Sequence, residues 1–404
     1  MRIAFVSYEY AGVASGGGIG TYVRNAAAML AGRGHEVEVF CGQGKAAPDG
    51  AVRVHAVGGA AEDFAEAALP LFAARQAARP FDVVEGPEYG ADAAPVARAF
   101  PDLPLVVRLH TPRFVIRQMD LAGLTWARKA RYMLGGLRRG QLPQRYWLYD
   151  PAEDPERAHA LAADEIVAPS QAVLDRLGPV WGLPGDRCAL VPNVYRPDPR
   201  LLSIDPETAS DRVLFLGRFE VRKGVLTLAR AIPLVLARRP DARFRLVGRD
   251  TPDPISGANI SDLVRRLVEP HGACVEIVGP APYDEVPHHL GECDVCVLPS
   301  RWEASGYACQ EAMAAARGVV ASSAGGMAEI LDGGRCGVLA PPDDPRALAD
   351  ALLDLLNAPE RRIALGRAAR ERVALAYGPE AVAPLQEASY HRAIARAAQR
   401  RRAA

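Results

Sequence analysis

Residues 1–40 read MRIAFVSYEYAGVASGGGIGTYVRNAAAMLAGRGHEVEVF, and the order of elements that this stretch predicts decides the fold class. The apolar run Ile3 to Val6 indicates a strand, and the turn after it is marked by Gly16, Gly17, Gly18 and Gly20. Apolar residues then recur at the spacing of a helix, at Val23, Ala26, Ala27 and Leu30. Gly34 is placed to end that helix, and His35 to Phe40 resumes as a strand. This order predicts a parallel sheet covered by helices.

The same alternation continues along the chain in two halves. In the first half we predict further strands at Phe81–Val84, Leu105–Leu109 and Glu165–Ala168. In the second half we predict strands at Val213–Leu216, Phe244–Val247, Val275–Val278, Val295–Leu298 and Val319–Ala321. Two doubly wound α/β domains are therefore expected to face each other across a cleft. Ligands of such sheets bind beyond the carboxyl ends of the strands, so the cleft is the expected site.

Domain limits follow from the breaks in this pattern. A proline-broken stretch without a long apolar run separates the halves between Tyr195 and Asp211. We assign residues 1–195 to the first domain, 196–210 to the linker, 211–385 to the second domain and 386–404 to a final helix.

Composition and charge exclude several classes of protein. The 404 residues include 48 Lys and Arg against 48 Asp and Glu, and this balance removes the simplest argument for a nucleic-acid partner. No apolar run approaches the ~20 residues of a membrane-spanning helix, and the apolar run after Arg2 is too short for a signal peptide, so we expect a cytoplasmic protein. The seven cysteines are expected to be free thiols, because Cys293-x-x-Cys296 lacks the second pair of a zinc site.

The glycine-rich turn of the first half does not match a dinucleotide site. Thr21 stands where the G-x-G-x-x-G pattern needs its last glycine, and the second strand ends in Phe40-Cys41-Gly42 without the acidic residue that would hold a ribose. Glycines before a helix still expose backbone N–H groups to phosphate or sugar oxygens. A flexible turn is the alternative interpretation.

Two stretches of the second half carry residues suited to a nucleotide sugar. Arg218 and Lys223 follow directly on a predicted strand, where a planar fork and a point charge would meet the charge of a diphosphate. Glu303 and Glu311 lie eight positions apart, and ionised carboxylates accept hydrogen bonds from pairs of hydroxyls. A solvated charged loop and isolated surface glutamates are the alternatives for these residues taken singly.

Together these motifs resemble the retaining glycosyltransferases of family 4, which have the GT-B fold and use nucleotide sugars. The resemblance covers nearly the whole chain, and its most specific part is Glu303-x7-Glu311 with Arg218-x4-Lys223. Weaker pieces occur in family order at Gly17 to Tyr22, Gly34 to Val37, His110, Pro169-Ser170, Val191 to Asn193, Phe244 to Gly248 and Pro299-Ser300. The resemblance implies two Rossmann-like domains, an acceptor-side first and a nucleotide-sugar-binding second, and a C-terminal helix that crosses back to the first domain.

The resemblance also assigns roles in donor binding. It implies that Arg218 and Lys223 hold the donor diphosphate and that Glu311 accepts hydrogen bonds from the ribose. It implies that Glu303 holds the donor sugar together with the loop residues after it, Ser305, Gly306 and Tyr307. Many family members have Gly, an aromatic residue and Gly after the first glutamate, where this chain has Ala304, Ser305 and Gly306. The identity of the sugar is therefore left open.

On the first domain the resemblance implies that Gly17 and Gly18 approach the phosphates or the acceptor. It places His110 beside the reacting sugar, and a histidine satisfied at a strand end is the alternative. We expect neither a metal nor a cofactor beyond the donor substrate, because Arg218, Lys223 and a helix N-terminus can supply the positive potential. Asp343-Asp344 before Pro345 indicates a helix cap rather than a metal motif.

The expected activity is transfer of a sugar from a nucleoside diphosphate to a hydroxyl of a glycan, a glycolipid or a small molecule. A same-face displacement and an enzyme nucleophile both remain open, and no carboxylate stands out as the nucleophile. A sugar-nucleotide epimerase of the same fold and a non-catalytic nucleotide-sugar-binding protein are the alternatives in function.

A basic stretch of the first half bears on the identity of the acceptor. Between Arg113 and Arg145 there are eight basic side chains against the single acid Asp120, interleaved with aromatic residues. One interpretation is contact with an anionic lipid headgroup or a phosphorylated acceptor, which would place the protein peripherally at the inner face of a membrane. The other is an arginine-rich solvated helix.

Overall fold

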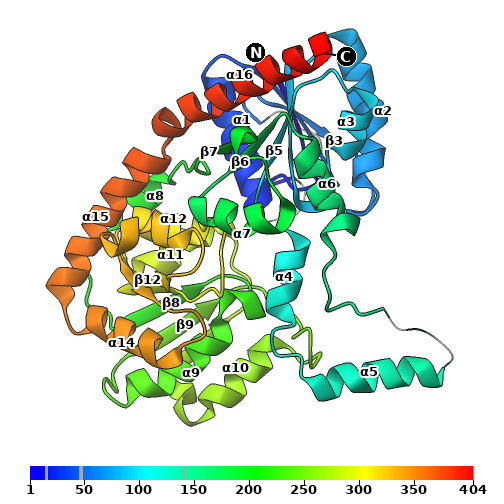
Figure 1. Ribbon diagram of the computed structural model, residues 1–404. Helices are drawn as coiled ribbons and strands as arrows, with labels where there is room; N and C mark the ends of the chain where they lie inside the picture. Colours follow the sequence, from blue (N-terminus) through cyan, green and yellow to red (C-terminus); the bar gives the residue numbers. More distant parts are fainter. Residues whose placement is uncertain (14–16, 45–48, 140–141, 143, 404) are drawn as a thin grey trace.

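The computed structural model describes residues 1–403 except 14–16, 45–48, 140–141 and 143. It has two α/β lobes, each built on a parallel sheet (Figure 1). This confirms the predicted class of two doubly wound domains. Among the described residues, no helix combines the length and the apolar content needed to cross a bilayer.

The first sheet has seven parallel strands in the order β3-β2-β1-β4-β5-β6-β7. They are β1 (Arg2–Val6), β2 (Glu36–Cys41), β3 (Arg53–Ala56), β4 (Val83–Pro87), β5 (Leu105–Arg108), β6 (Glu165–Ala168) and β7 (Cys188–Leu190). The helices of this half are α1 (Gly18–Gly32), α2 (Phe64–Ala78), α3 (Ala94–Ala99), α4 (Arg113–Asp120), α5 (Trp126–Arg138), α6 (Pro155–Ala162) and α7 (Gln171–Trp181). The strand order reverses between β1 and β4, which is where sheets of this kind bind ligands.

The second sheet has six parallel strands in the order β10-β9-β8-β11-β12-β13. They are β8 (Arg212–Leu216), β9 (Arg243–Val247), β10 (Val275–Val278), β11 (Val295–Leu298), β12 (Gly318–Ser322) and β13 (Val338–Ala340). The helices of this half are α9 (Val225–Leu236), α10 (Ile260–Val268), α11 (Val286–Gly291), α12 (Tyr307–Ala314), α13 (Met327–Ile330), α14 (Pro345–Leu356) and α15 (Pro359–Tyr377). Here the order reverses between β8 and β11.

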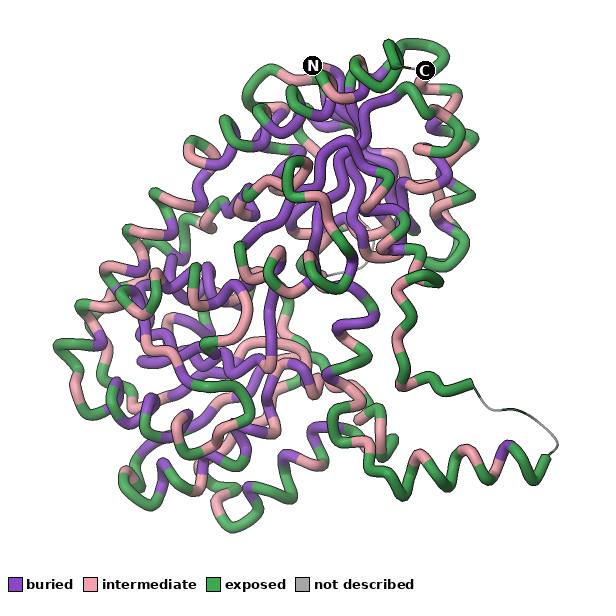
Figure 2. The backbone as a smooth tube through the Cα atoms, viewed as in Figure 1, coloured by how far each residue is buried: buried purple, intermediate pink, exposed green. Residues whose placement is uncertain are grey.

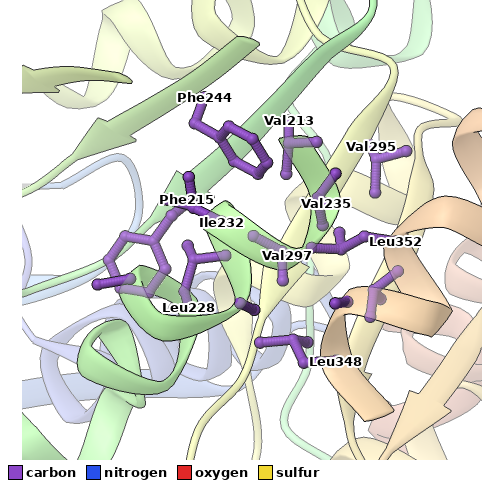
Figure 3. Close-up of a cluster of buried hydrophobic side chains, with 14 of the residues drawn as sticks. Val213, Phe215, Leu228, Ile232, Val235, Phe244, Val295, Val297, Leu348 and Leu352 are labelled. Atoms are coloured by element: carbon purple, nitrogen blue, oxygen red, sulfur yellow. The ribbon is translucent and has the colours of Figure 1, made fainter. Parts of the chain in front are cut away.

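The core of the second domain shows why these strands form. Side chains that alternate along β8 and β11 point toward α9 and α14, and Figure 3 shows them packed against the apolar stripes of those helices. The labelled side chains are Val213, Phe215, Phe244, Val295 and Val297 from the strands and Leu228, Ile232, Val235, Leu348 and Leu352 from the helices. All are buried. In both lobes burial concentrates in the sheets and on the helix faces that cover them (Figure 2).

All ten predicted strands are present, within three residues at each end, and three strands were missed. The missed strands β3, β7 and β13 lie at the edges of their sheets. Edge strands are covered on fewer sides, so they need no continuous apolar run, and β3 reads only RVHA with Arg53 exposed. The predicted cap is also confirmed, because Asp344 accepts hydrogen bonds from the backbone of Arg346 and Ala347 at the start of α14. All seven cysteines are free.

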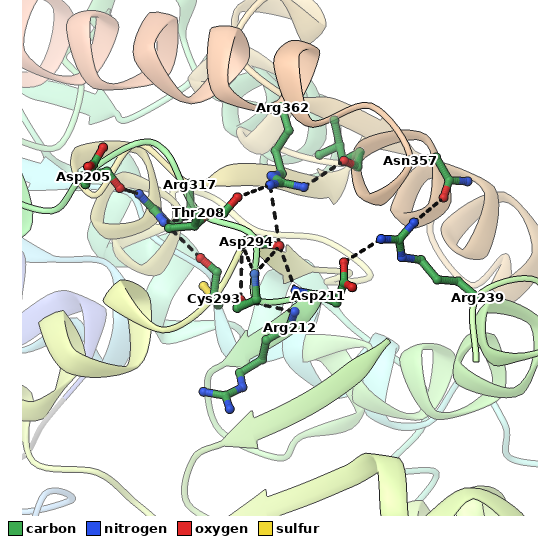
Figure 4. A network of polar contacts seen from close by, with 12 residues as sticks. Asp205, Thr208, Asp211, Arg212, Arg239, Cys293, Asp294, Arg317, Asn357 and Arg362 are labelled. Atoms are coloured by element: carbon green, nitrogen blue, oxygen red, sulfur yellow. Dashed lines mark hydrogen bonds and ion pairs between the residues drawn. The ribbon is translucent and has the colours of Figure 1, made fainter. Parts of the chain in front are cut away.

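The segment between the two sheets is anchored to the second domain. It contains the short helix α8 (Pro199–Leu202) and then runs along the second sheet. Asp294 accepts hydrogen bonds from the backbone of Ser210 and Asp211, and Arg317 and Arg362 donate to carbonyl groups of the same segment (Figure 4). This network fixes the position at which the chain enters β8.

The last helix, α16 (Pro379–Ala403), crosses from the second lobe back over the first (Figure 1). It begins seven residues before the predicted start, directly after α15. Its Gln386 and Tyr390 donate hydrogen bonds to the buried Glu85 of β4, at 2.8 and 2.7 Å. Arg392 and Arg396 pair with Glu165 of β6. The crossing helix that the family resemblance implied is therefore present.

Candidate functional site

A cavity of about 640 Å³ lies between the two domains. It is lined from the first domain by residues after β1 and β5, and from the second domain by residues after β8, β9 and β11. These are the carboxyl ends of strands that lie at each reversal of strand order or one strand away from it. The position agrees with the expectation that the cleft is the site.

The turn after β8 carries the first predicted donor residues. Gly217 and Arg218 line the cavity, and a one-turn helix, η4 (Val221–Lys223), brings Lys223 to its wall. Gly224 ends η4 with φ of +70°, and a Cβ there would lie 1.8 Å from the carbonyl oxygen of Pro299 after β11. Only glycine lets this turn pack so closely against the end of β11.

Lys223 and Glu303 form an ion pair across the reversal of strand order, with the Lys223 ammonium donating to Oε2 of Glu303. Arg222 adds a second cation, 3.6 Å from Oε1 of Glu303. Burial raises the pKa of Glu303, but the charges of Lys223 and Arg222 outweigh burial and leave the pKa below its usual value. Burial lowers the pKa of Lys223, and Glu303 opposes that effect. The structure therefore places an ionised carboxylate among cations at the wall.

Arg218 is held by a neighbour that the motifs did not single out. Its Nη1 lies 2.8 Å from Oε1 of Glu220, and Glu220 also binds Nε of Arg222 at 2.8 Å. Arg249, directly after Gly248 at the end of β9, also lines the cavity, and no ion pair joins it to any described residue. Position directly after a strand end was the signal that could have identified Arg249.

The loop after Glu303 is fixed by close backbone contacts. Gly326 donates its N–H to the carbonyl of Glu303 at 2.8 Å, and a Cβ on Gly326 would lie 2.3 Å from the carbonyl oxygen of Ala304. From the first domain, Ser170 donates its hydroxyl to the same Ala304 carbonyl at 2.9 Å. Both domains therefore hold the loop, whose residues Ser305, Gly306, Tyr307 and Ala308 line the cavity at the start of α12.

Glu311 is placed differently from Glu303. It lies on α12, one turn beyond Tyr307, is buried and is not among the residues that line the cavity. No cation pairs with it among the described residues, and burial raises its pKa to about 8. The sequence pattern thus brings one glutamate to the wall and leaves the second buried beside it.

On the first-domain wall, Gly17 and Gly18 form the start of α1. A Cβ on Gly17 would lie 2.3 Å from Oε2 of Glu9, a residue that also lines the cavity and accepts from the backbone N–H of Gly20 at 3.2 Å. This close approach explains the glycine at 17. Gly16 of the predicted turn lies outside the described residues.

His110 follows β5 and reaches the cavity, as the resemblance implied. Its ring packs edge-on against Tyr22 with centroids 5.6 Å apart, and its buried Nε2 has no hydrogen-bond partner. Burial and the charge of Arg108 lower its pKa to about 3. The imidazole is therefore neutral at physiological pH and presents an unused nitrogen near the site.

The comparisons with known proteins agree with this geometry. Residues 16–198 match the family model described as Glycosyltransferase Family 4, and residues 210–358 match the model described as Glycosyl transferases group 1. A D-inositol 3-phosphate glycosyltransferase of Kineococcus radiotolerans is 30% identical over 96% of this chain and 94% of its own length. The chain belongs to glycosyltransferase family 4. The matched models and the named relative are glycosyltransferases, which favours sugar transfer over the epimerase and binding-protein alternatives.

Solved structures show that this family 4 glycosyltransferase has the GT-B fold. A sucrose-phosphate synthase from Thermosynechococcus elongatus superimposes with a TM-score of 0.72 at 22% identity, covering 98% of this chain and all of that chain. The Anabaena HepE protein in complex with UDP and glucose gives a TM-score of 0.66 at 16% identity, covering 96% and 99%. Within the described ranges, no group of three His, Cys, Asp or Glu side chains is arranged to hold a metal ion.

Proposed function

We propose that this glycosyltransferase moves a sugar from a nucleoside-diphosphate sugar to a hydroxyl acceptor, with retention of anomeric configuration and without a required metal ion. The observation that carries the proposal is the group of Arg218, Arg222 and Lys223 around Glu303, at the reversal of strand order in the second sheet. Such positions bind the anionic part of a ligand in doubly wound sheets.

The chain's own cations would perform the chemistry at the leaving group. As the bond from the sugar to phosphate breaks, negative charge grows on the departing diphosphate, and fixed donors aimed at that charge lower the barrier. In this proposal the diphosphate competes with Glu220 and Glu303 for Arg218 and Lys223. Glu303 then turns its acceptor oxygens to the hydroxyls of the donor sugar.

The remaining site residues would position the donor. Ser305, Gly306 and Tyr307 line the cavity at the start of α12, and the N–H groups of a helix start favour phosphate or sugar oxygens. Ribose hydroxyls would donate to Glu311. His110 stays neutral, so its free nitrogen serves as a hydrogen-bonding group beside the sugar rather than as a cation.

Nucleotide binding tests the proposal first, and the stereochemistry of the product tests it second. Millimolar UDP, GDP, ADP and TDP are compared by thermal unfolding, and a nucleotide at 100 times its Kd adds ~2.7 kcal/mol of stability. Turnover is then measured in EDTA, and the anomeric coupling of the product is determined by NMR. An α-linked donor should give an α-linked product. An unchanged melting temperature with every nucleotide would contradict the donor site. Loss of turnover in EDTA would contradict the metal-free reaction, and a β-linked product would contradict retention.

We further infer a peripheral contact with an anionic membrane, made from the cytoplasmic side by α5. This helix projects sideways at the level of the second lobe, near α10 (Figure 1), and most of it is exposed (Figure 2). At helical spacing its apolar side chains share one face, which consists of Trp126, Ala130, Met133, Leu134 and Leu137. Its charged side chains are all basic, namely Arg128, Lys129, Arg131 and Arg138. This pattern is typical of helices that lie in a membrane interface.

Vesicle sedimentation tests this contact. Vesicles with an anionic lipid should bind the protein more than neutral vesicles, and added salt should weaken binding. Leu134→Glu combined with Leu137→Glu should abolish it. Leu385→Glu, at an exposed leucine of α16, is the matched control. Equal sedimentation of the double variant and the wild type would contradict the contact.

A further inference from the structure

The two walls of the cavity carry opposite charges. From this difference we infer that the acceptor is a polyhydroxy compound without a phosphate group on the ring that receives the sugar. The inference rests on the proposed function, since it takes the first-domain wall as the acceptor side. It adds the chemical class of the acceptor to that proposal.

The second-domain wall is rich in cations. Arg218, Arg222, Lys223 and Arg249 all line the cavity, against the two acids Glu220 and Glu303. An anionic diphosphate would therefore meet opposite charge on this side. These cations are supplied by the chain itself.

The first-domain wall has the opposite character. Among its described residues that line the cavity, the charged side chains are the carboxylates of Glu9 and Asp120, and none is a lysine or an arginine. Hydrogen-bonding groups without charge come from Tyr89, Thr111 and Asn193. No side-chain hydrogen bond of Asp120 is present among the described residues, so its oxygens are available to hydroxyl donors. Burial and the charge of Glu220 raise the pKa of Asp120, and the charges of Arg222 and Arg301 from the second domain oppose this shift.

More carboxyl groups stand directly behind this wall. Glu88 is fully buried beside Tyr89, and neither of its carboxyl oxygens has a hydrogen-bond partner. Asp92 also follows β4 and accepts from the backbone N–H of Tyr8 at 2.7 Å, and Glu156 of α6 accepts from the backbone N–H of Gly90 at 3.0 Å. Burial raises the pKa of all three carboxyls, so they oppose a phosphate against Tyr89 less than ionised carboxylates on the cavity surface do.

Arg113, a cation beside Tyr89 of this wall, is already paired. Arg113 stacks on the ring of Tyr89 at 5.0 Å, and its Nε lies 3.4 Å from Oε1 of Glu156. The backbone N–H of Arg113 donates to the other oxygen of Glu156 at 2.8 Å. Arg113 therefore stands against the buried Glu156 and its acidic neighbours, and among the described residues that line the first-domain wall none is a lysine or an arginine that could meet an acceptor phosphate.

The structure separates the basic stretch from the acceptor side of the cavity. The basic stretch from Arg113 to Arg145 suggested either an anionic headgroup or a phosphorylated acceptor. In the structure α4 contributes Ile116 and Asp120 to the cavity, whereas α5 contributes no lining residue and extends away from it (Figure 1). Four of the eight basic side chains therefore lie on the exposed α5, the other four do not line the cavity either, and the acceptor side of the cavity is acidic.

Matched acceptor pairs test the inference. The full chain is given the nucleotide sugar that proves active, with myo-inositol against D-inositol 3-phosphate, glucose against glucose 6-phosphate, and glucosamine as a cationic acceptor. Product is measured by mass spectrometry. We expect transfer to unphosphorylated members with kcat/KM at least about tenfold above that of their phosphorylated partners, because like charges are juxtaposed in the latter. Equal or faster transfer to a phosphorylated member would overturn the inference.

Binding decides the question if none of these acceptors is used. D-inositol 3-phosphate and glucose 6-phosphate are titrated into the protein, with and without saturating UDP, beside their unphosphorylated partners. Binding of a phosphorylated compound more tightly than its partner would overturn the inference, and its absence supports it. Failure of every nucleoside diphosphate to bind would instead contradict the proposed function, so the two failures are distinguishable.

A charge-reversal variant tests whether the first-domain wall causes the difference between acceptors. Asp120→Arg should narrow the difference between phosphorylated and unphosphorylated acceptors, because it places a cation on the acidic wall. Asp241→Arg makes the same change at an exposed residue before the amino end of β9, away from the cavity, and should leave the difference unchanged. An unaltered difference in Asp120→Arg would show that the first-domain wall does not select the acceptor.

Discussion

The two walls of the cavity are held in place by different means. On the second domain, Glu220 pairs with Arg218 and Arg222, which are only two residues away from it. Lys223 pairs with Glu303, which follows the neighbouring strand β11. On the first domain, the floor below His110 is the buried pair Arg108 and Glu85, joined to residues as distant as α16. The comparison teaches that the donor side is built from local motifs, whereas the acceptor side depends on packing across the whole chain.

The largest effect is expected on the first-domain side. Arg108 lies 3.3 Å from Glu85 and is fully buried, so Arg108→Met would leave Glu85 as an uncompensated buried charge. We expect a loss of about 3–5 kcal/mol in the free energy of unfolding, measured by urea denaturation. Arg98→Met breaks the exposed pair with Glu66 and should cost at most about 1 kcal/mol. Equal losses in both variants would contradict the contrast between the walls.

Lys223→Ala should produce the next largest effect, and in turnover rather than in stability. A donor aimed at charge that grows in the transition state contributes on the order of 10²–10³ in rate. We therefore expect kcat to fall by this factor with a smaller change in the KM for the donor. Arg230→Ala, at an exposed position of α9, is the control. Wild-type kinetics in Lys223→Ala would make the lysine a structural partner of Glu303 only.

The pH dependence of nucleotide affinity tests whether Glu311 binds the ribose. Its carboxyl is mostly protonated below its pKa of about 8, and the ionised form is the stronger acceptor for a pair of ribose hydroxyls. Nucleotide affinity measured by calorimetry should therefore rise with pH up to 8, by at most about tenfold per pH unit, with proton release on binding. Glu311→Gln should remove this dependence. A pH-independent affinity in the wild type would place the ribose elsewhere.

The same residue makes a prediction for stability. Because the pKa of Glu311 is higher in the folded than in the unfolded protein, its contribution is most favourable at low pH and is lost as pH rises toward 8. Glu311→Gln should therefore raise the melting temperature relative to wild type, and by more at pH 9 than at pH 5. A constant difference between the two proteins would contradict the raised pKa.

The smallest effect is expected at Arg249, which is exposed and unpaired among the described residues. Exposed charges contribute about 1 kcal/mol at most, which corresponds to a change of about fivefold in affinity. Arg249→Ala should raise the KM for the donor by this factor and leave kcat unchanged. A fall in kcat at constant KM would show instead that Arg249 acts on the transition state.

Much of the fold could be predicted because its signals are local. The glycine-rich turn before α1 and the apolar strands of both sheets are continuous in the sequence, and buried parallel strands need such runs. The missed strand β7 consists of Cys188–Leu190 at a sheet edge, where no such run is required. The family motifs led to Arg218, Lys223 and Glu303 because each follows a strand end. Arg249 also follows a strand end but belongs to none of the family motifs, and the importance of Glu9 comes from the side of the cavity on which it lies.

The sequence by itself determined the two α/β domains, the family and the cations of the donor side. These depend on residues close together in the chain, where spacing fixes which side chains meet. Only the tertiary structure decided that Glu311 is buried, that α16 reaches Glu85, and that carboxylates rather than arginines face the acceptor side. The physical reason is that burial and electrostatic environment depend on contacts between segments as much as 300 residues apart, such as Glu85 and Gln386.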